Sequence, residues 1–118
     1  DTDTKRALGL GNRDSIGKND MMLFSYPEGD TPVFWMKNMR FPIDIVWVRR
    51  DTVVGIEKMA DPQIGKDDED LTLYPAPEEI DAVLEVAGGT SDRLRLRVGD
   101  TITTSKVIYG TSTTTTNK

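Results

Sequence analysis

The sequence contains no cysteine and no histidine. A chain without these side chains has no disulfide bonds, no thiol nucleophile, no imidazole base and few ways to hold zinc. It also has no apolar run near the roughly 20 residues that a membrane-spanning helix needs, and no basic-then-apolar leader at its start. We therefore expect a soluble polypeptide without a metal, a cofactor or a membrane span.

Basic residues are fewer than acidic ones, with 15 Lys and Arg against 20 Asp and Glu, which gives a formal charge of -5. This balance disfavours a general attraction to phosphate backbones or anionic membranes, so we expect no nucleic-acid partner. The 118 residues are enough for one compact domain. We predict a monomeric domain over residues 1–110 and a disordered, Thr-rich tail over residues 111–118.

Short apolar runs separated by turn residues indicate a mainly β protein of the α+β class. We expect a small antiparallel sheet or a partly closed barrel of about five to seven strands, with one or two short helices. A capped helix is predicted from Thr2 or Asp3 to Leu8, and another from Thr90 or Ser91 into Val98. The predicted strands are residues 21–25, 33–37, 43–48, 53–57, 82–86 and 101–109.

The stretch from Phe34 to Val48 contains both tryptophans and is divided into two strands by Pro42, which cannot donate a ladder hydrogen bond. Alternation in the second strand places Ile43, Ile45 and Trp47 on one face, and Asp44, Val46 and Val48 on the other. Both faces are mostly apolar. This strand is therefore expected to be central and covered on both sides.

Residues 60–73 contain a proline, a glycine and the acidic run Asp67–Asp70, and we expect them to form a long exposed loop. Such loops often carry function. The acidic run lacks the alternating ligands of a calcium loop, so a solvated charge run is the preferred interpretation. Arg93, Arg95 and Arg97 are interpreted in the same way, as a solvated face.

Several motifs together resemble the domain of unknown function 192 (DUF192) family of bacteria and archaea. Their order and spacing match over roughly residues 3–104, and the most specific part is Trp-Met-Lys-Asn followed by Pro-x-Asp. The motifs are Arg6-x-x-Gly9-Leu10-x-x-Arg13, Met22-Leu23-Phe24, Phe34-Trp35-Met36-Lys37-Asn38, Pro42-x-Asp44-Ile45, Leu84-Glu85-Val86 with Gly89, and Val98-Gly99-Asp100.

The resemblance implies a small, mainly antiparallel β domain with short helices, and it implies no activity. Family members usually have Gly at Met21, Met at Gly11 and Thr at Met39, and they have one further strand before the first helix. That strand is either trimmed here or replaced in its pairing by the chain beyond Gly99. The family is often found behind a signal peptide, so an extracytoplasmic location is one expectation and a cytoplasmic location the other.

The polar residues of the central stretch have two interpretations. In the structural one, which we rank first, Lys37 and Asp44 form a partly buried ion pair and Asn38 caps backbone groups near the turn. In the functional one, polar groups surround a cleft walled by tryptophan, which suits a small polar ligand, an envelope glycan or a partner protein. The ligand-binding candidates are Arg13, Trp35, Lys37, Asn38, Asp44 and Glu85.

Whether the protein is an enzyme is left open by these residues. A lysine beside a carboxylate, or two carboxylates, could perform acid and base chemistry. We therefore rank a non-catalytic binding or accessory domain first. The alternative is a small hydrolase or lyase that uses Lys37 with Asp44 or Glu85.

Overall fold

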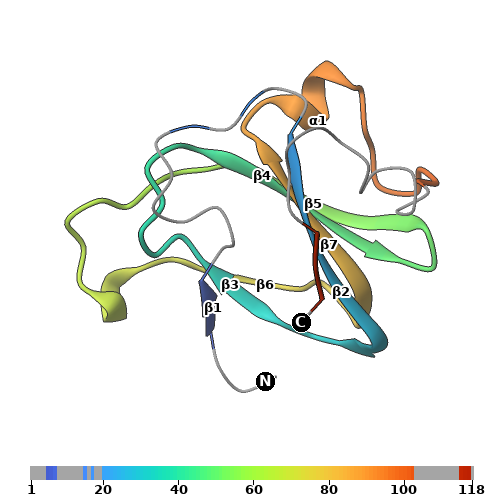
Figure 1. Cartoon of the computed structure of the whole chain (residues 1–118), viewed down its shortest axis with the longest axis horizontal. Coiled ribbons are helices and arrows are strands. Elements are labelled where there is room, and N and C mark those ends of the chain that lie inside the picture. The colour runs from blue at the N-terminus through green and yellow to red at the C-terminus, as the bar shows by residue number, and fades with distance from the viewer. Residues whose placement is uncertain (1–4, 8–14, 16, 18–19, 103–114, 118) are drawn as a thin grey trace.

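The computed structural model describes residues 5–7, 15, 17, 20–102 and 115–117, and these residues form two β-sheets with one short α-helix and one 3-10 turn (Figure 1). The five-stranded sheet has the order β5-β4-β7-β2-β8, and the three-stranded sheet has the order β1-β3-β6. The predicted mainly β class is confirmed, in the form of two sheets rather than a closed barrel. The strands are β1 (Lys5–Ala7), β2 (Met21–Asp30), β3 (Val33–Trp35), β4 (Ile43–Arg49), β5 (Thr52–Ala60), β6 (Leu73–Pro75), β7 (Ile80–Ala87) and β8 (Thr115–Asn117).

Strand β4 is an inner strand of the large sheet, antiparallel to β5 on one side and to β7 on the other. Its residues from Ile43 to Val48 are all buried, as the sequence predicts. The pairing register shifts between Trp47 and Val48, opposite Gly55, which confirms the expected irregularity there. An added Cβ at Gly55 would lie 2.9 Å from the Pro77 ring, so this position requires glycine.

The two faces of the large sheet bury separate apolar clusters. The face that carries Ile43, Ile45 and Trp47 packs against Phe34 of β3, and the Phe34 and Trp47 rings stack with 5.4 Å between centroids. The opposite face carries Val46 and Val48. The alternation in β4 thus predicts both faces correctly, and the small sheet covers one of them.

The chain after β7 begins with α1 (Thr90–Arg93), which is shorter than the predicted helix. The helix ends because Leu94 already caps it and Arg95 adopts a left-handed φ of 56°. Residues 94–102 then return to the second face of the large sheet, where Leu96 and Ile102 pack and Thr101 bridges to Thr52.

The predicted first helix is wrong where the structure describes it. Residues 5–7 are the strand β1, which pairs in parallel with β3, and this pairing supplies the hydrogen bonds that so short a helix would lack. Residues 115–117 of the predicted tail form β8 beside β2. The remaining residues of both segments, and residues 103–109 of the predicted last strand, lie outside the described residues. Within the described part of the chain, no helix has the length and apolar character of a membrane span.

Candidate functional site

Residues 36–39, which begin with the signature residues Met36, Lys37 and Asn38, form a tight turn between the two sheets. The Met39 backbone N–H donates to the Met36 carbonyl at 3.1 Å, and Asn38 takes a φ of 64°. Positive φ at the third position is the mark of a type II turn, where glycine or asparagine is favoured. Asn38 therefore fixes the direction of this turn, while Met36 and Met39 are buried beneath it.

Lys37, the second residue of the turn, is held between two groups. Its Nζ donates a 2.9 Å hydrogen bond to Asp68 Oδ2 and lies 5.1 Å from the centre of the Trp35 ring. The Lys37 and Asp68 side chains are 39% and 54% exposed, so this ion pair is accessible to solvent. The ring and the carboxylate together orient the ammonium at the surface.

Asp68 belongs to the loop between β5 and β6, which has a defined structure. The Gln63 amide closes its base, since Nε2 donates to Thr72 Oγ1 at 2.9 Å and Oε1 accepts from the Thr72 N–H at 2.8 Å. We call this pair the Gln63–Thr72 clasp. A 3-10 turn follows at Asp68–Asp70, and Leu71 is buried. The predicted long exposed loop is confirmed, and it is closed at its base.

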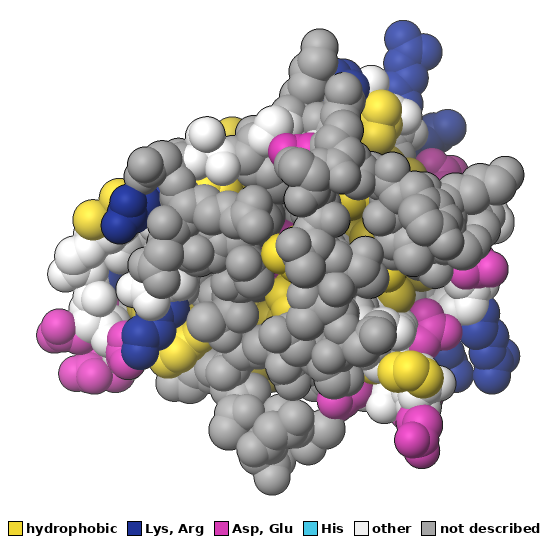
Figure 2. Space-filling view, in the orientation of Figure 1, with side chains coloured by type: hydrophobic (Ala, Val, Ile, Leu, Met, Phe, Trp, Pro, Cys, Tyr) yellow, Lys and Arg dark blue, Asp and Glu magenta, His cyan; other side chains and the backbone are white. Residues whose placement is uncertain are grey.

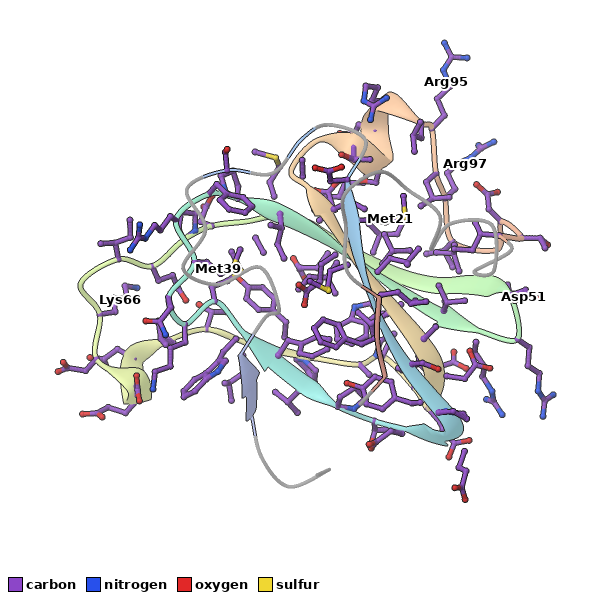
Figure 3. The ribbon with its side chains drawn as sticks, in the orientation of Figure 1. Met21, Met39, Asp51, Lys66, Arg95 and Arg97 are labelled. Carbon is purple, nitrogen blue, oxygen red and sulfur yellow. The ribbon has the colours of Figure 1, made fainter. Side chains whose placement is uncertain are left out.

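The turn and this loop enclose a pocket of about 420 Å³. This volume lies in the range of small-molecule sites. Figure 3 labels Met39 on the turn and Lys66 on the loop, at the end of the molecule from which the loop projects. The lining residues are Met36, Lys37, Asn38, Met39, Arg40, Gln63, Ile64, Gly65, Lys66, Asp68 and Leu71.

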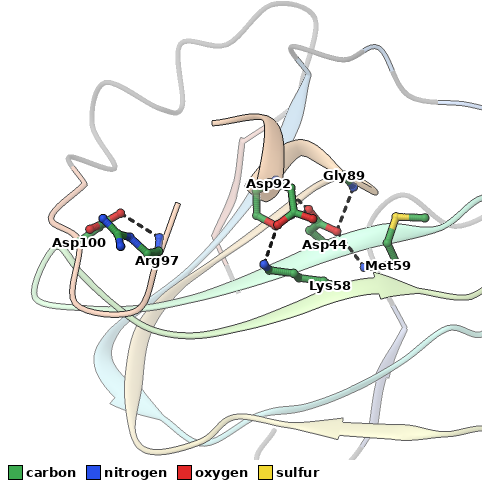
Figure 4. Close-up of polar contacts among 8 residues, drawn as sticks. Asp44, Lys58, Met59, Gly89, Asp92, Arg97 and Asp100 are labelled. Carbon is green, nitrogen blue, oxygen red and sulfur yellow. Dashed lines mark hydrogen bonds and ion pairs between the residues drawn. The ribbon is translucent and has the colours of Figure 1, made fainter. Parts of the chain in front are cut away.

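Asp44 does not meet Lys37, and the predicted ion pair is wrong. The strands that flank Pro42 belong to different sheets, so the two side chains are directed to different partners. Asp44 is fully buried and accepts from the backbone N–H groups of Met59, Gly89 and Ser91 at 2.9, 3.2 and 2.8 Å, and from Ser91 Oγ at 2.7 Å (Figure 4). It joins β4 to the end of β5 and the start of α1.

Glu85 is also fully buried and lies on the other face of the large sheet. It is opposite Ile45 in the β4–β7 register, whereas Asp44 is opposite Val86. Successive residues of a strand point to opposite faces. The two carboxylates therefore cannot act together on one substrate, and neither lines the pocket.

Of the six ligand-binding candidates, Lys37 and Asn38 line the pocket, whereas Trp35 does not line it and contacts Lys37. Asp44 and Glu85 are in the core, and Arg13 lies outside the described residues. Sequence reasoning missed Arg40, Gln63, Lys66 and Asp68. For the three loop residues the length of the loop is the available signal, but the sequence favours interpreting its acidic run as solvated charge; Arg40 has no such signal. Among the described residues, no three acidic side chains are grouped to hold a metal.

The comparisons with known proteins agree with this architecture. The sequence profile of DUF192, described as "Uncharacterized ACR", matches residues 1–104. A crystal structure of a protein of unknown function from Novosphingobium aromaticivorans is 32% identical, with a TM-score of 0.67 over 82% of this chain and 70% of that one. A crystal structure of a "putative transcription regulator" from Sinorhizobium meliloti is 30% identical, with a TM-score of 0.69 over 79% of this chain and 68% of that one. No curated protein matches the sequence.

Proposed function

This chain belongs to the DUF192 family, and on that premise we propose that it is a non-catalytic binding or accessory domain whose pocket recognises a small polar ligand. One observation carries the proposal. The family signature Lys37-Asn38 and the loop closed by the Gln63–Thr72 clasp, far apart in the sequence, line the same pocket of about 420 Å³.

The chemistry of the lining supports a polar ligand with a small apolar part. Lys37, Asn38 and Gln63 supply donors and acceptors, and Met36 and Leu71 form an apolar base. Ile64, at the rim, is 77% exposed, which leaves a large apolar side chain available to cover a ligand. Pockets that combine apolar walls with a few placed polar groups are typical of small-molecule sites.

The hydrolase or lyase alternative has less support from this geometry. Lys37 lines the pocket without either of its expected carboxylate partners, because Asp44 and Glu85 are both buried elsewhere. The carboxylate beside Lys37 is Asp68, and it already forms an ion pair. Binding a ligand requires no further catalytic group, so this arrangement supports binding better than catalysis.

The proposal is tested by thermal unfolding with a panel of sugars, sugar phosphates, carboxylic acids, peptides and a short DNA duplex. The duplex is included because of the description of the Sinorhizobium protein. A ligand at 100 times its Kd stabilises the fold by about 2.7 kcal/mol. For a domain of this size we expect the melting temperature to rise by about 10 to 20 °C.

Two lysine variants place the ligand in the pocket. Lys37→Gln should weaken binding about tenfold, the usual loss for a hydrogen bond to a charged group. Lys58→Gln is the matched control, since Lys58 also forms an exposed ion pair, with Asp92 at 2.6 Å, but does not line the pocket. Equal losses in both variants, or no stabilisation by any compound, would refute the proposal.

A further inference from the structure

The charges around the pocket differ from those of the whole chain. The protein carries a formal charge of -5, yet the lining contains Lys37, Arg40 and Lys66 against Asp68 as the single carboxylate. Figure 2 shows basic and acidic side chains side by side at this end of the molecule. Three cationic residues around one concave site attract an anion, even in an acidic protein.

Asp68 acts as an anion that belongs to the chain itself. Its carboxylate lies at the pocket wall and accepts from Lys37 Nζ at 2.9 Å. The backbone holds it there, because the Asp70 N–H donates to the Asp67 carbonyl at 2.9 Å and the Leu71 N–H donates to the Asp68 carbonyl at 3.2 Å. An oxyanion is therefore already bound at the ammonium of Lys37.

This internal contact is easy to replace. Both partners are more than a third exposed, and exposed ion pairs of this kind are weak and screened by salt. Lys37 has three N–H donors, and the Trp35 ring confines its ammonium whichever anion it contacts. A ligand oxyanion gains the same donors and, in addition, the field of Arg40 and Lys66.

We propose that the pocket binds a small molecule through a phosphate or carboxylate group that displaces Asp68 from Lys37. This rests on the proposed function and narrows it to anionic ligands. Asp68 is then a competitor built into the site, and its charge lowers the affinity of the pocket for every anion. The pocket is larger than one oxyanion, so the remainder of the ligand lies against Met36, Met39 and Leu71.

The experiment is calorimetric titration of the wild-type chain, Asp68→Asn and Asp67→Asn with inorganic phosphate, citrate, glucose 6-phosphate and glucose. Asp67→Asn removes the same charge one residue away. It is a matched control because Asp67 does not line the pocket and its side chain makes no capping hydrogen bond. Comparing the affinities for inorganic phosphate and for citrate distinguishes a phosphate ligand from a carboxylate ligand.

We expect Asp68→Asn to bind glucose 6-phosphate about two- to fivefold more tightly than the wild type, the size of a released exposed ion pair. Asp67→Asn should change the affinity less than twofold, since its effect is only long-range and screened. Binding of glucose 6-phosphate should weaken as salt is added. Binding of citrate without binding of inorganic phosphate would identify a carboxylate ligand.

Three results overturn the inference. Equal gains in Asp68→Asn and Asp67→Asn would show a general charge effect without displacement. Glucose binding as tightly as glucose 6-phosphate would refute an anionic ligand while the proposed function stands. Weaker anion binding in Asp68→Asn would make Asp68 part of the ligand contact instead of its competitor. If no compound of the wider panel stabilises the fold either, the proposed function itself fails.

Discussion

Both carboxylate oxygens of Asp44 are used within the protein. Oδ1 accepts from the Met59 and Gly89 N–H groups, and Oδ2 accepts from the N–H and hydroxyl of Ser91. These donors come from the end of β5 and from the start of α1. Asp44 thus replaces the side-chain cap that α1 lacks, because Gly89 at the N-cap position has no side chain to offer.

Asp44→Asn tests this role. The amide keeps the size of the side chain but presents N–H groups to donors, so buried N–H groups lose their acceptor. We expect a loss of about 2 to 4 kcal/mol in the free energy of unfolding, measured by urea denaturation. Asp92→Asn removes an exposed partner of Lys58 and should cost less than about 1 kcal/mol. A similar cost for both variants would contradict the assignment.

The Gln63–Thr72 clasp gives the long loop between β5 and β6 a fixed conformation, so that it forms one wall of the pocket. Two hydrogen bonds join its ends, Leu71 anchors it in the core, and the tip between them is exposed. Loops whose ends lie close together and whose side chains pack internally are often functional. In this protein, the clasp positions Asp68 opposite Lys37.

Gln63→Ala should loosen the loop without unfolding the sheets. The lost hydrogen bonds are each worth about 0.5 to 1.5 kcal/mol, so amide exchange at Asp70 and Leu71 should accelerate about tenfold. Exchange within β4 and β7 should not change. Thr72→Ser retains the hydroxyl and the N–H, and it serves as the control. Acceleration across the whole chain would mean that the loop is part of the global folding unit.

The sequence predicts those elements whose signal is local. The alternation of side chains along β4 correctly predicts which residues lie on each face of the sheet, because it depends only on residues next to one another in the sequence. The partner of Lys37 is not local, since Asp68 is 31 residues away. The predicted ion pair between Lys37 and Asp44 rests on the assumption that strands adjacent in the sequence pair in one sheet. Pro42 instead separates strands of two different sheets. The chain therefore passes from the small sheet to the large sheet at Pro42, and the site forms where it does so.

At the scale of the molecule, the large sheet is covered on both faces. The loop between β5 and β6, which lines the pocket, and α1 lie in different parts of the molecule (Figure 1). Arg95 and Arg97 project from the α1 end, away from Lys66 and Met39 (Figure 3). A ligand in the pocket therefore leaves the α1 end free. In the absence of ligand, the stability of the whole fold can be measured by itself.

Alkaline pH offers such a test, through Tyr74 in the small sheet. Burial raises the pKa of Tyr74 above its usual 10.0, the carboxylates of Glu57 and Asp61 raise it further, and a hydrogen bond with Thr72 opposes them. The unfolded chain then loses this proton first as pH increases. Stability is full below about pH 10 and declines as pH rises through the folded-state pKa.

The substitution Tyr74→Phe removes the phenol group whose titration lowers the stability at alkaline pH. We expect its free energy of unfolding to fall less than that of the wild type above about pH 10, measured by urea denaturation at several pH values. The comparison between the two proteins cancels the effect of lysines, which titrate in the same range. Parallel declines in the two proteins would show that Tyr74 does not contribute.

The clasp at the base of the pocket loop also has a consequence for mutational tolerance. Gln63 and Thr72 fix where the loop begins and ends, and the residues between them, apart from Leu71, contribute little to the apolar core. Substitutions at Ile64, Lys66 or Asp68 should therefore alter the lining of the pocket while the sheets stay intact. The composition of the pocket wall is thereby separated from the folding of the sheets.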